Sequence, residues 1–99
     1  MRGIVIDPGA KPELYRLPDT LQELQRFMGG YAQRCPISNR FAALFYLPQA
    51  GQSLPTRHYN GRFYGRLCLV GWRNARMTDL PKPLAEELLQ KFTPVEVTP

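Results

Sequence analysis

Along much of the chain, apolar residues either alternate with polar ones or form short continuous runs, and both patterns are typical of strands. Residues 3–6 form an apolar run before an Asp-Pro-Gly turn, and residues 13–17 alternate polar with apolar, which predicts a hairpin. Residues 31–37 and 63–72 predict two further strands. Residues 41–47 are apolar at odd and even positions alike, which indicates a central strand with one face under a helix.

Two other segments repeat their apolar residues at helical spacing. The first follows a capping box at residues 20–23 and ends at Gly29-Gly30, where a glycine supplies the left-handed cap. The second begins at residues 78–81, where a capping residue precedes a proline in the first turn. The predicted apolar faces are Leu21, Leu24, Phe27 and Met28 in the first helix and Leu84, Leu88 and Phe92 in the second.

Together these elements predict one α+β domain over residues 1–99, a mostly antiparallel sheet of about five strands with two helices in the order ββαβββα. Residues 93–99 are expected to form a frayed C-terminal tail. Pro36 favours an edge position for its strand, and Gly65 and Gly71 indicate a bulge or a close backbone approach.

Composition narrows the class of protein. No apolar run reaches the length of a transmembrane helix, and the run near the N-terminus is too short for a signal peptide, so a cytoplasmic location is expected. Cys35 and Cys68 lack the close spacing of metal ligands and are expected to be reduced, buried thiols. With His58 as the only histidine, neither a metal site nor a cofactor is expected.

Positive charge is concentrated in the middle of the sequence. Between Gln25 and Thr78 there are eight arginines, no lysine and no acidic residue, and aromatic residues lie among the arginines. The net charge of +5 excludes a mimic of DNA, which must be acidic. A guanidinium binds phosphate or carboxylate through two parallel hydrogen bonds and stacks on flat rings, so arginine with tyrosine or tryptophan is typical of a nucleotide site.

Three interpretations of this stretch remain open. The first is a site for an anionic nucleotide-like ligand or a nucleic acid, with bases on the aromatic rings and phosphates on the arginines. The second is a solvated basic face whose arginine stems cover apolar surface. The third is a basic face that docks on an acidic protein.

Residues 57–62, Arg-His-Tyr-Asn-Gly-Arg, form the densest cluster of reactive side chains. A histidine base beside an arginine would suit a metal-independent phosphodiesterase, but most such enzymes need a second acid or base, and the chain has no second histidine. Binding is therefore favoured over catalysis. The predicted ligand-binding residues are Arg57, His58, Tyr59, Asn60, Arg62, Arg66 and Trp72. Because so small a domain cannot easily enclose a dinucleotide, a pocket shared between protomers of a homo-oligomer is expected.

Short motifs along nearly the whole chain carry a resemblance to a known family. They are Leu17-Pro18-Asp19-Thr20-Leu21-Gln22-Glu23-Leu24-Gln25 leading to Gly29-Gly30-Tyr31, then Leu54-Pro55 and Asn60-Gly61-Arg62, then Tyr64-Gly65 before Arg66-Leu67-Cys68-Leu69-Val70-Gly71, and finally Thr78-Asp79-Leu80 through Leu88-Leu89-Gln90-Lys91-Phe92. In this order they resemble the small phage, plasmid and bacterial proteins catalogued as domain of unknown function 3846. The chain departs from that pattern at Phe45-Tyr46-Leu47-Pro48, where the family is expected to carry an asparagine and an acidic residue.

The resemblance implies a mobile-element setting, in which small single-domain proteins often counter bacterial immune systems. Some unrelated phage proteins of this size are sponges that sequester cyclic nucleotide signals, and an acid-free middle rich in arginine and aromatic residues suits that role. The expected function is a non-catalytic sponge for a phosphorylated nucleotide-like signal in the cytoplasm of a bacterial host. The alternatives are a nucleic-acid-binding accessory protein and an inhibitor that docks on an acidic host protein.

Overall fold

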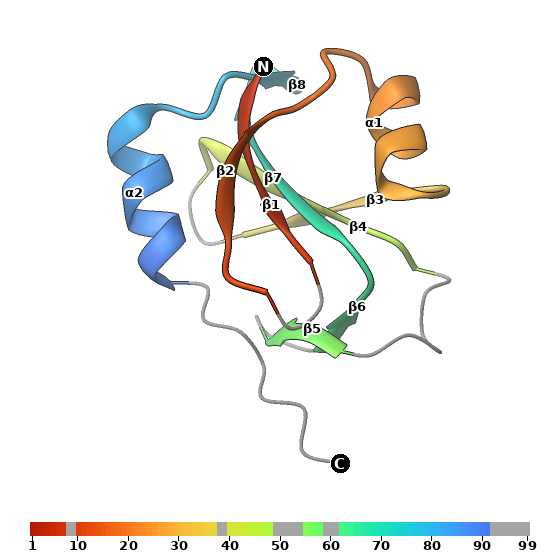
Figure 1. The fold of residues 1–99 in the computed structure, drawn as a ribbon. Coiled ribbons are helices and arrows are strands. Elements are labelled where there is room, and N and C mark those ends of the chain that lie inside the picture. The colour runs from red at the N-terminus through yellow and green to blue at the C-terminus, as the bar shows by residue number, and fades with distance from the viewer. Residues whose placement is uncertain (8–9, 38–39, 49–54, 59–61, 92–99) are drawn as a thin grey trace.

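One antiparallel sheet runs through the middle of the molecule, with a helix on each face (Figure 1). The computed structural model describes residues 1–7, 10–37, 40–48, 55–58 and 62–91. Its elements are β1 (Arg2–Ile6), β2 (Glu13–Arg16), α1 (Leu21–Met28), β3 (Gln33–Pro36), β4 (Ala42–Tyr46), β5 (Pro55–His58), β6 (Arg62–Tyr64), β7 (Leu67–Arg73), β8 (Arg76–Thr78) and α2 (Lys82–Lys91). The main sheet has the order β2-β1-β7-β4-β3, with β8 paired to β7, and β5 and β6 form a separate two-stranded sheet. The predicted α+β class with two helices is confirmed.

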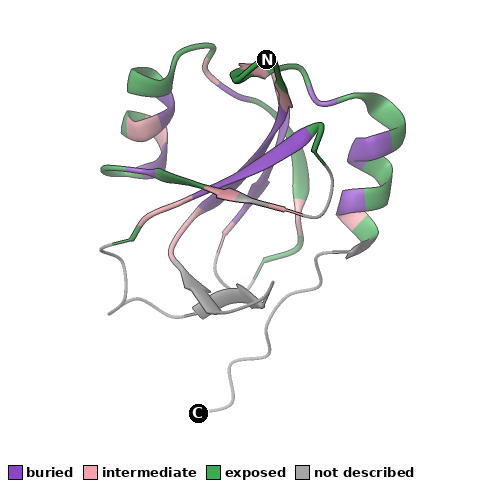
Figure 2. Cartoon of the chain, turned by 180° about the vertical axis from the view of Figure 1, so that it is seen from behind, coloured by how far each residue is buried: buried purple, intermediate pink, exposed green. Residues whose placement is uncertain are grey.

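The central strand β7 is buried on both faces. Leu67 and Leu69 join the cluster under α2, whereas Cys68 and Val70 join the cluster under α1. Figure 2 shows the buried residues along the middle strands and on the inward sides of the helices. The strand β4 lies inside the sheet and is also buried on both faces, so the prediction of a central strand with a helix over one face of residues 41–47 is confirmed. A second helix covers its other face as well, because the residues at odd and at even positions are both apolar.

The first helix begins and ends as its sequence predicts. The Thr20 hydroxyl accepts a hydrogen bond from the Glu23 amide at 3.2 Å, and Gly29 takes the left-handed cap with φ of 101°. These bonds satisfy backbone groups that a helix end leaves without partners. Leu24 and Met28 are buried, but Leu21 is 45% exposed, so the predicted apolar face is only partly covered.

The predicted strand at 63–72 is two strands. Gly65 adopts φ of 74°, a left-handed conformation that a glycine adopts without strain, and it separates β6 from β7. The strand β8 was not predicted. A two-residue turn links it to β7, with Asn74 at φ 52° and Ala75 at φ 59°. Two positive φ values are those of a type I′ turn, but alanine in place of the usual glycine hides this turn in the sequence.

Some predicted features lie outside the described residues. They include the Pro8-Gly9 turn and the tail at 93–99. The one-domain prediction over residues 1–99 stays a prediction. None of the helices in the described part of the chain is long and apolar enough to cross a membrane.

Gly71 confirms the predicted close backbone approach. A Cβ atom on this residue would collide with the carbonyl oxygen of Asp79 and would lie 2.8 Å from that of Thr78. These are backbone atoms of β8 and its continuation, so they cannot move aside as a flexible side chain would. We expect Gly71→Ala to lower the free energy of unfolding by about 2 kcal/mol or more in a urea titration.

Gly30→Ala is the matched control for this substitution. The nearest atom to a Cβ at Gly30 is Leu47 Cδ2 at 3.9 Å, an ordinary contact. We expect its unfolding free energy to stay within about 0.5 kcal/mol of the unsubstituted protein. Equal effects of the two substitutions would contradict the close approach at Gly71.

Cys68 is fully buried in the sheet beneath α1. This burial raises the pKa of the Cys68 thiol to about 12, while the charge of Arg66 lowers it and that of Asp7 raises it by smaller amounts. The ordinary pKa of the group is 9.0, so the unfolded chain releases this proton at a lower pH than the folded chain does. The stabilisation that the protonated Cys68 thiol adds to the free energy of unfolding is therefore complete below pH 9, and it is lost as the pH rises towards 12.

We expect this difference to appear in unfolding experiments at alkaline pH. Between about pH 8 and about pH 10, ionisation of Cys68 in the unfolded chain should lower the free energy of unfolding by roughly 1 kcal/mol. Cys68→Ala creates a small cavity and should be less stable at both pH values. Because it has no thiol at this position, its free energy of unfolding should fall by roughly 1 kcal/mol less than that of the unsubstituted protein between the two pH values. An identical pH dependence in the two proteins would show that Cys68 does not stay protonated in the fold.

Candidate functional site

The densest predicted cluster falls on the small β5–β6 sheet. Arg57 and His58 lie on β5 and Arg62 lies on β6, with His58 opposite Arg62 in the register. Their backbones are described and their side chains are not, and Tyr59 and Asn60 lie outside the described residues. The assignment of these five residues to a ligand site stays a prediction.

Arg66 lies next to this sheet and is engaged within the protein. Its Nε donates to Asp7 Oδ1 at 2.7 Å, and its Nη1 donates to the Phe27 carbonyl at 3.1 Å. The guanidinium also stacks 4.5 Å from the centre of the Phe27 ring. These contacts fasten the start of β7 to the end of α1. The guanidinium therefore binds groups within the protein itself. Its assignment as a ligand-binding residue stays a prediction.

Trp72 lies at the other end of β7 from Arg66. Figure 1 shows β6 and β8 at opposite ends of this strand, and Trp72 pairs with Met77 of β8. The structure therefore does not bring Trp72 together with Arg66, although the sequence prediction places them in one site. Six positions along an extended strand separate them by about 20 Å.

Trp72 instead lines a groove beside α1, with a volume of about 530 Å³. Its apolar wall includes Phe45 and Met77, and Tyr31 lies at the rim with 64% of its surface exposed. The exposed Leu21 also lines it, which explains why that part of the predicted apolar helix face has no cover. The groove thus combines aromatic surface with an open side.

Arginine and tryptophan stack in this groove. The Arg34 guanidinium lies 4.7 Å from the centre of the Trp72 ring, and the Phe45 ring packs against Trp72 at 6.3 Å and 57°. The pairing of β3 with β4 places Arg34 opposite Phe45, on the face of the sheet that α1 covers. A cation over a ring face is attracted by the ring quadrupole, so Trp72 holds the Arg34 side chain across its surface.

A pair of arginines lies at the β7–β8 turn, and one of them lines the groove. Arg76 lines the groove, and its cross-strand partner in the register is Arg73. Both side chains are exposed, and neither makes an ion pair with any residue that the structure describes. Like charges directly opposite each other are unfavourable in an antiparallel pair, and an anion shared by both would relieve the repulsion.

The acidic residue of the groove is Asp19, at the end where α1 begins. It accepts a hydrogen bond from the Met1 ammonium at 2.9 Å. This hydrogen bond and the charge of the ammonium lower the pKa of the Asp19 carboxyl, with a weaker contribution from Arg16. The groove therefore has a carboxylate at one end that stays ionised below its ordinary range, and arginines along the rest.

The sequence predicts the arginine and aromatic chemistry of this groove, but it does not predict which residues line it. Arg34, Arg76 and Tyr31 all lie in the acid-free stretch, yet only Trp72 was predicted as a site residue. Strand pairing brings these residues together, and no local signal reveals that pairing. Within the described part of the chain, no three histidine, cysteine, aspartate or glutamate side chains gather as a metal ion would need.

The contacts of Arg66 predict a structural role for it. Arg66→Ala removes the ion pair with Asp7, the hydrogen bond to Phe27 and the ring contact, so we expect about 1 kcal/mol less stability and a melting temperature roughly 5 °C lower. Arg26→Ala is the control, because Arg26 is exposed on the same helix as Phe27. Unchanged stability of Arg66→Ala would show that these contacts contribute nothing and would leave Arg66 free for a ligand.

No protein-family model matches the chain, and no curated protein or solved structure matches it either. The resemblance to domain of unknown function 3846 therefore stays a prediction. The residues of the groove itself are the basis on which a function is proposed.

Proposed function

We propose that this protein binds, without chemical turnover, an anionic small molecule that carries a flat ring, a phosphorylated nucleotide-like signal, in the groove at Trp72. The observation that carries the proposal is the stack of Arg34 on Trp72 in a groove that Arg76 and Tyr31 also line. A base stacks on exposed aromatic rings, and a phosphate accepts paired hydrogen bonds from guanidinium groups. Asp19 is available to accept a hydrogen bond from a base amino group or a sugar hydroxyl.

The size of the groove supports a small ligand. Its volume of about 530 Å³ falls within the range of about 300–1,000 Å³ that small-molecule sites occupy. The groove is open on one side, so one copy of the chain covers only part of a dinucleotide. The predicted sharing of a ligand between protomers of a homo-oligomer fits this geometry and remains part of the proposal.

Binding without catalysis is favoured by the side chains that line the groove. Among the described lining residues there is no histidine or cysteine, and Asp19 is the one carboxylate. A general base works best with a pKa near the operating pH, and the hydrogen bond from the Met1 ammonium moves the pKa of Asp19 further below it. The lining thus offers stacking and charge but no group suited to take a proton.

The wider role follows the expectation from the sequence. We propose a phage-type accessory protein of the host cytoplasm, which sequesters a nucleotide signal and so counteracts host immunity. A sponge needs a specific pocket, a high copy number and no turnover, and the groove is the proposed pocket. The family resemblance supports the mobile-element setting, whereas the ligand chemistry rests on the groove.

Trp72 is the only tryptophan, so its fluorescence reports on the groove directly. We expect AMP and a cyclic dinucleotide to quench it at saturable concentrations, with adenosine and ribose 5-phosphate binding more weakly because each lacks half of the recognised chemistry. Arg34→Ala should weaken AMP binding about tenfold or more, measured by calorimetry because the substitution also alters the fluorescence. Arg26→Ala removes an equal charge outside the groove and should leave the affinity unchanged.

Other outcomes would identify the alternatives. Binding of an oligo-deoxythymidine strand that weakens steeply with salt, without binding of mononucleotides, would support the nucleic-acid-binding alternative. Capture of an acidic host protein after nuclease treatment, with no response to any nucleotide, would support the inhibitor. Equal affinity of Arg34→Ala and the unsubstituted protein for AMP would remove the groove from the proposal.

A further inference from the structure

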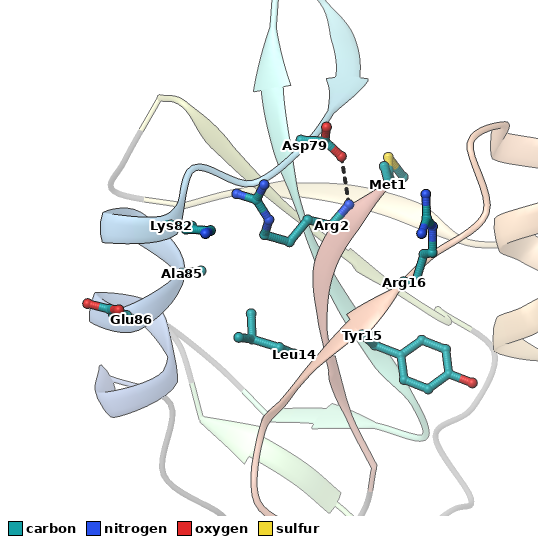
Figure 3. Close-up of a pocket in the computed structure, with 9 residues that line it drawn as sticks. All are labelled: Met1, Arg2, Leu14, Tyr15, Arg16, Asp79, Lys82, Ala85 and Glu86. Atoms are coloured by element: carbon teal, nitrogen blue, oxygen red, sulfur yellow. Dashed lines mark hydrogen bonds between the residues drawn. The ribbon is translucent and has the colours of Figure 1, made fainter.

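A second hollow lies between the edge strand β2 and helix α2, with a volume of about 720 Å³ (Figure 3). It is on the side of the sheet that α2 covers, so it is separate from the Trp72 groove. Its basic lining residues are Arg2, Arg16 and Lys82, and Leu14 and Ala85 supply apolar surface. Three features of this hollow point to the same kind of partner.

The first feature is an apolar row that ends in solvent. Across the sheet, Leu44 pairs with Leu69, Leu69 with Ile4, and Ile4 with Leu14. The first three are fully buried, whereas Leu14 is 52% exposed because β2 is the last strand. One more strand carrying an apolar residue opposite Leu14 would continue the row and cover its end.

The second feature is the free backbone edge of β2. Leu17 both donates to the Met1 carbonyl and accepts from the Met1 ammonium, so its backbone groups face β1. Backbone groups of alternate residues face the same side of a strand, so those of Leu14 and Arg16 face away from β1. These N–H and C=O groups can pair with an added strand.

The third feature is a group of cations at one end of the hollow. Arg2 and Arg16 are direct cross-strand neighbours, and Lys82 of α2 lines the same space. Among the described residues, the Arg2 guanidinium donates only to the neutral Leu80 carbonyl, at 3.2 Å. Two acidic residues also line the hollow, Asp79 and Glu86. The Asp79 carboxylate accepts a hydrogen bond from the Arg2 backbone amide at 2.7 Å, and Glu86 lies one helical turn beyond Lys82. Neither forms an ion pair with these three cations within the described part of the chain.

We propose that this hollow binds an extended acidic segment of a partner protein, which adds to the sheet as a strand antiparallel to β2. An apolar side chain of the segment packs on Leu14 and Ala85. The residue opposite Arg16 then lies two positions earlier in the segment, and its carboxylate binds among Arg16, Arg2 and Lys82. The recognised pattern is therefore an acidic residue, any residue, then an apolar residue.

A second copy of this chain fits the hollow less well. On the edge of a second copy, the residues whose backbone groups face away from β1 would again be Pro12, Leu14 and Arg16. Pairing two such edges would bring Pro12 or Leu14 opposite Arg16, and neither offers a carboxylate. Pro12 also lacks an amide hydrogen to donate. The charge and the backbone pattern together favour a foreign acidic strand.

A labelled peptide, Thr-Thr-Glu-Thr-Leu-Thr-Thr with blocked ends, tests the proposal by fluorescence anisotropy and by amide chemical shifts. We expect saturable binding with a dissociation constant below about 1 mM and shifts at β2 and α2. Arg16→Gln should weaken binding about fivefold or more, because it removes the charge opposite the glutamate. Lys11→Gln, on the same hairpin but outside the hollow, should have no effect, and neither should Arg34→Ala in the Trp72 groove.

N-methylation of the peptide distinguishes strand addition from simple charge attraction. Methyl groups on the amides of Glu and Leu, which would face β2, should abolish binding, whereas a methyl group on the amide between them should be tolerated. Equal effects of the two modifications, or no binding of the unmodified peptide at millimolar concentration, would overturn the proposal. Inorganic phosphate shifting the same amides as strongly as the peptide would reduce the hollow to an anion site, and shifts at β2 that grow with protein concentration alone would assign it to a second copy.

Discussion

The burial of β7 on both faces is the constraint on which the rest of the structure depends. This strand has neighbours along both edges and a helix over each face, so its residues from Leu67 to Val70 have no exposed surface. A polar side chain there would lose its water without gaining a partner. Polar chemistry is therefore confined to the ends of the strand and to the outer strands, and Arg66 and Trp72 lie at the two ends.

Local signals in the sequence predicted much of this fold. The N-cap at Thr20, the glycine cap at Gly29 and the first hairpin each depend on a few neighbouring residues whose conformation is limited by short-range sterics and hydrogen bonds. The order of strands and the placement of the helices on opposite faces depend on contacts between distant segments. The strand β8 was missed for a more specific reason, because Ala75 adopts a left-handed conformation for which glycine is the usual signal.

The candidate site shows the same division between composition and arrangement. The acid-free stretch correctly indicated arginine with aromatic rings, because charge and residue type are properties of the sequence itself. Residues close in the sequence are not always close in space. The sequence predicts one ligand site that contains both Arg66 and Trp72, whereas the residue that contacts Trp72 in the structure is Arg34. Arg34 reaches Trp72 through two strand pairings, β3 with β4 and β4 with β7, and neither pairing has a local signature. Knowledge of the register alone would have brought Arg34 and Phe45 to the same face as Trp72.

Two pairs of arginines lie in direct cross-strand register, Arg73 with Arg76 at the β7–β8 turn and Arg2 with Arg16 beside the hollow at β2. Such pairs cost an isolated sheet up to about 1 kcal/mol each, although water reduces the repulsion between exposed side chains. The fold does not require them, because a lysine–glutamate or threonine pair would serve the same register. An anion placed between two guanidinium groups converts the repulsion into attraction and accepts hydrogen bonds from both. Arg76 also lines the groove that holds the stack of Arg34 on Trp72, whereas Arg2 and Arg16 lie beside an open strand edge. The proposed partners therefore differ, a ring-bearing anion for the groove and an acidic strand for the hollow at β2.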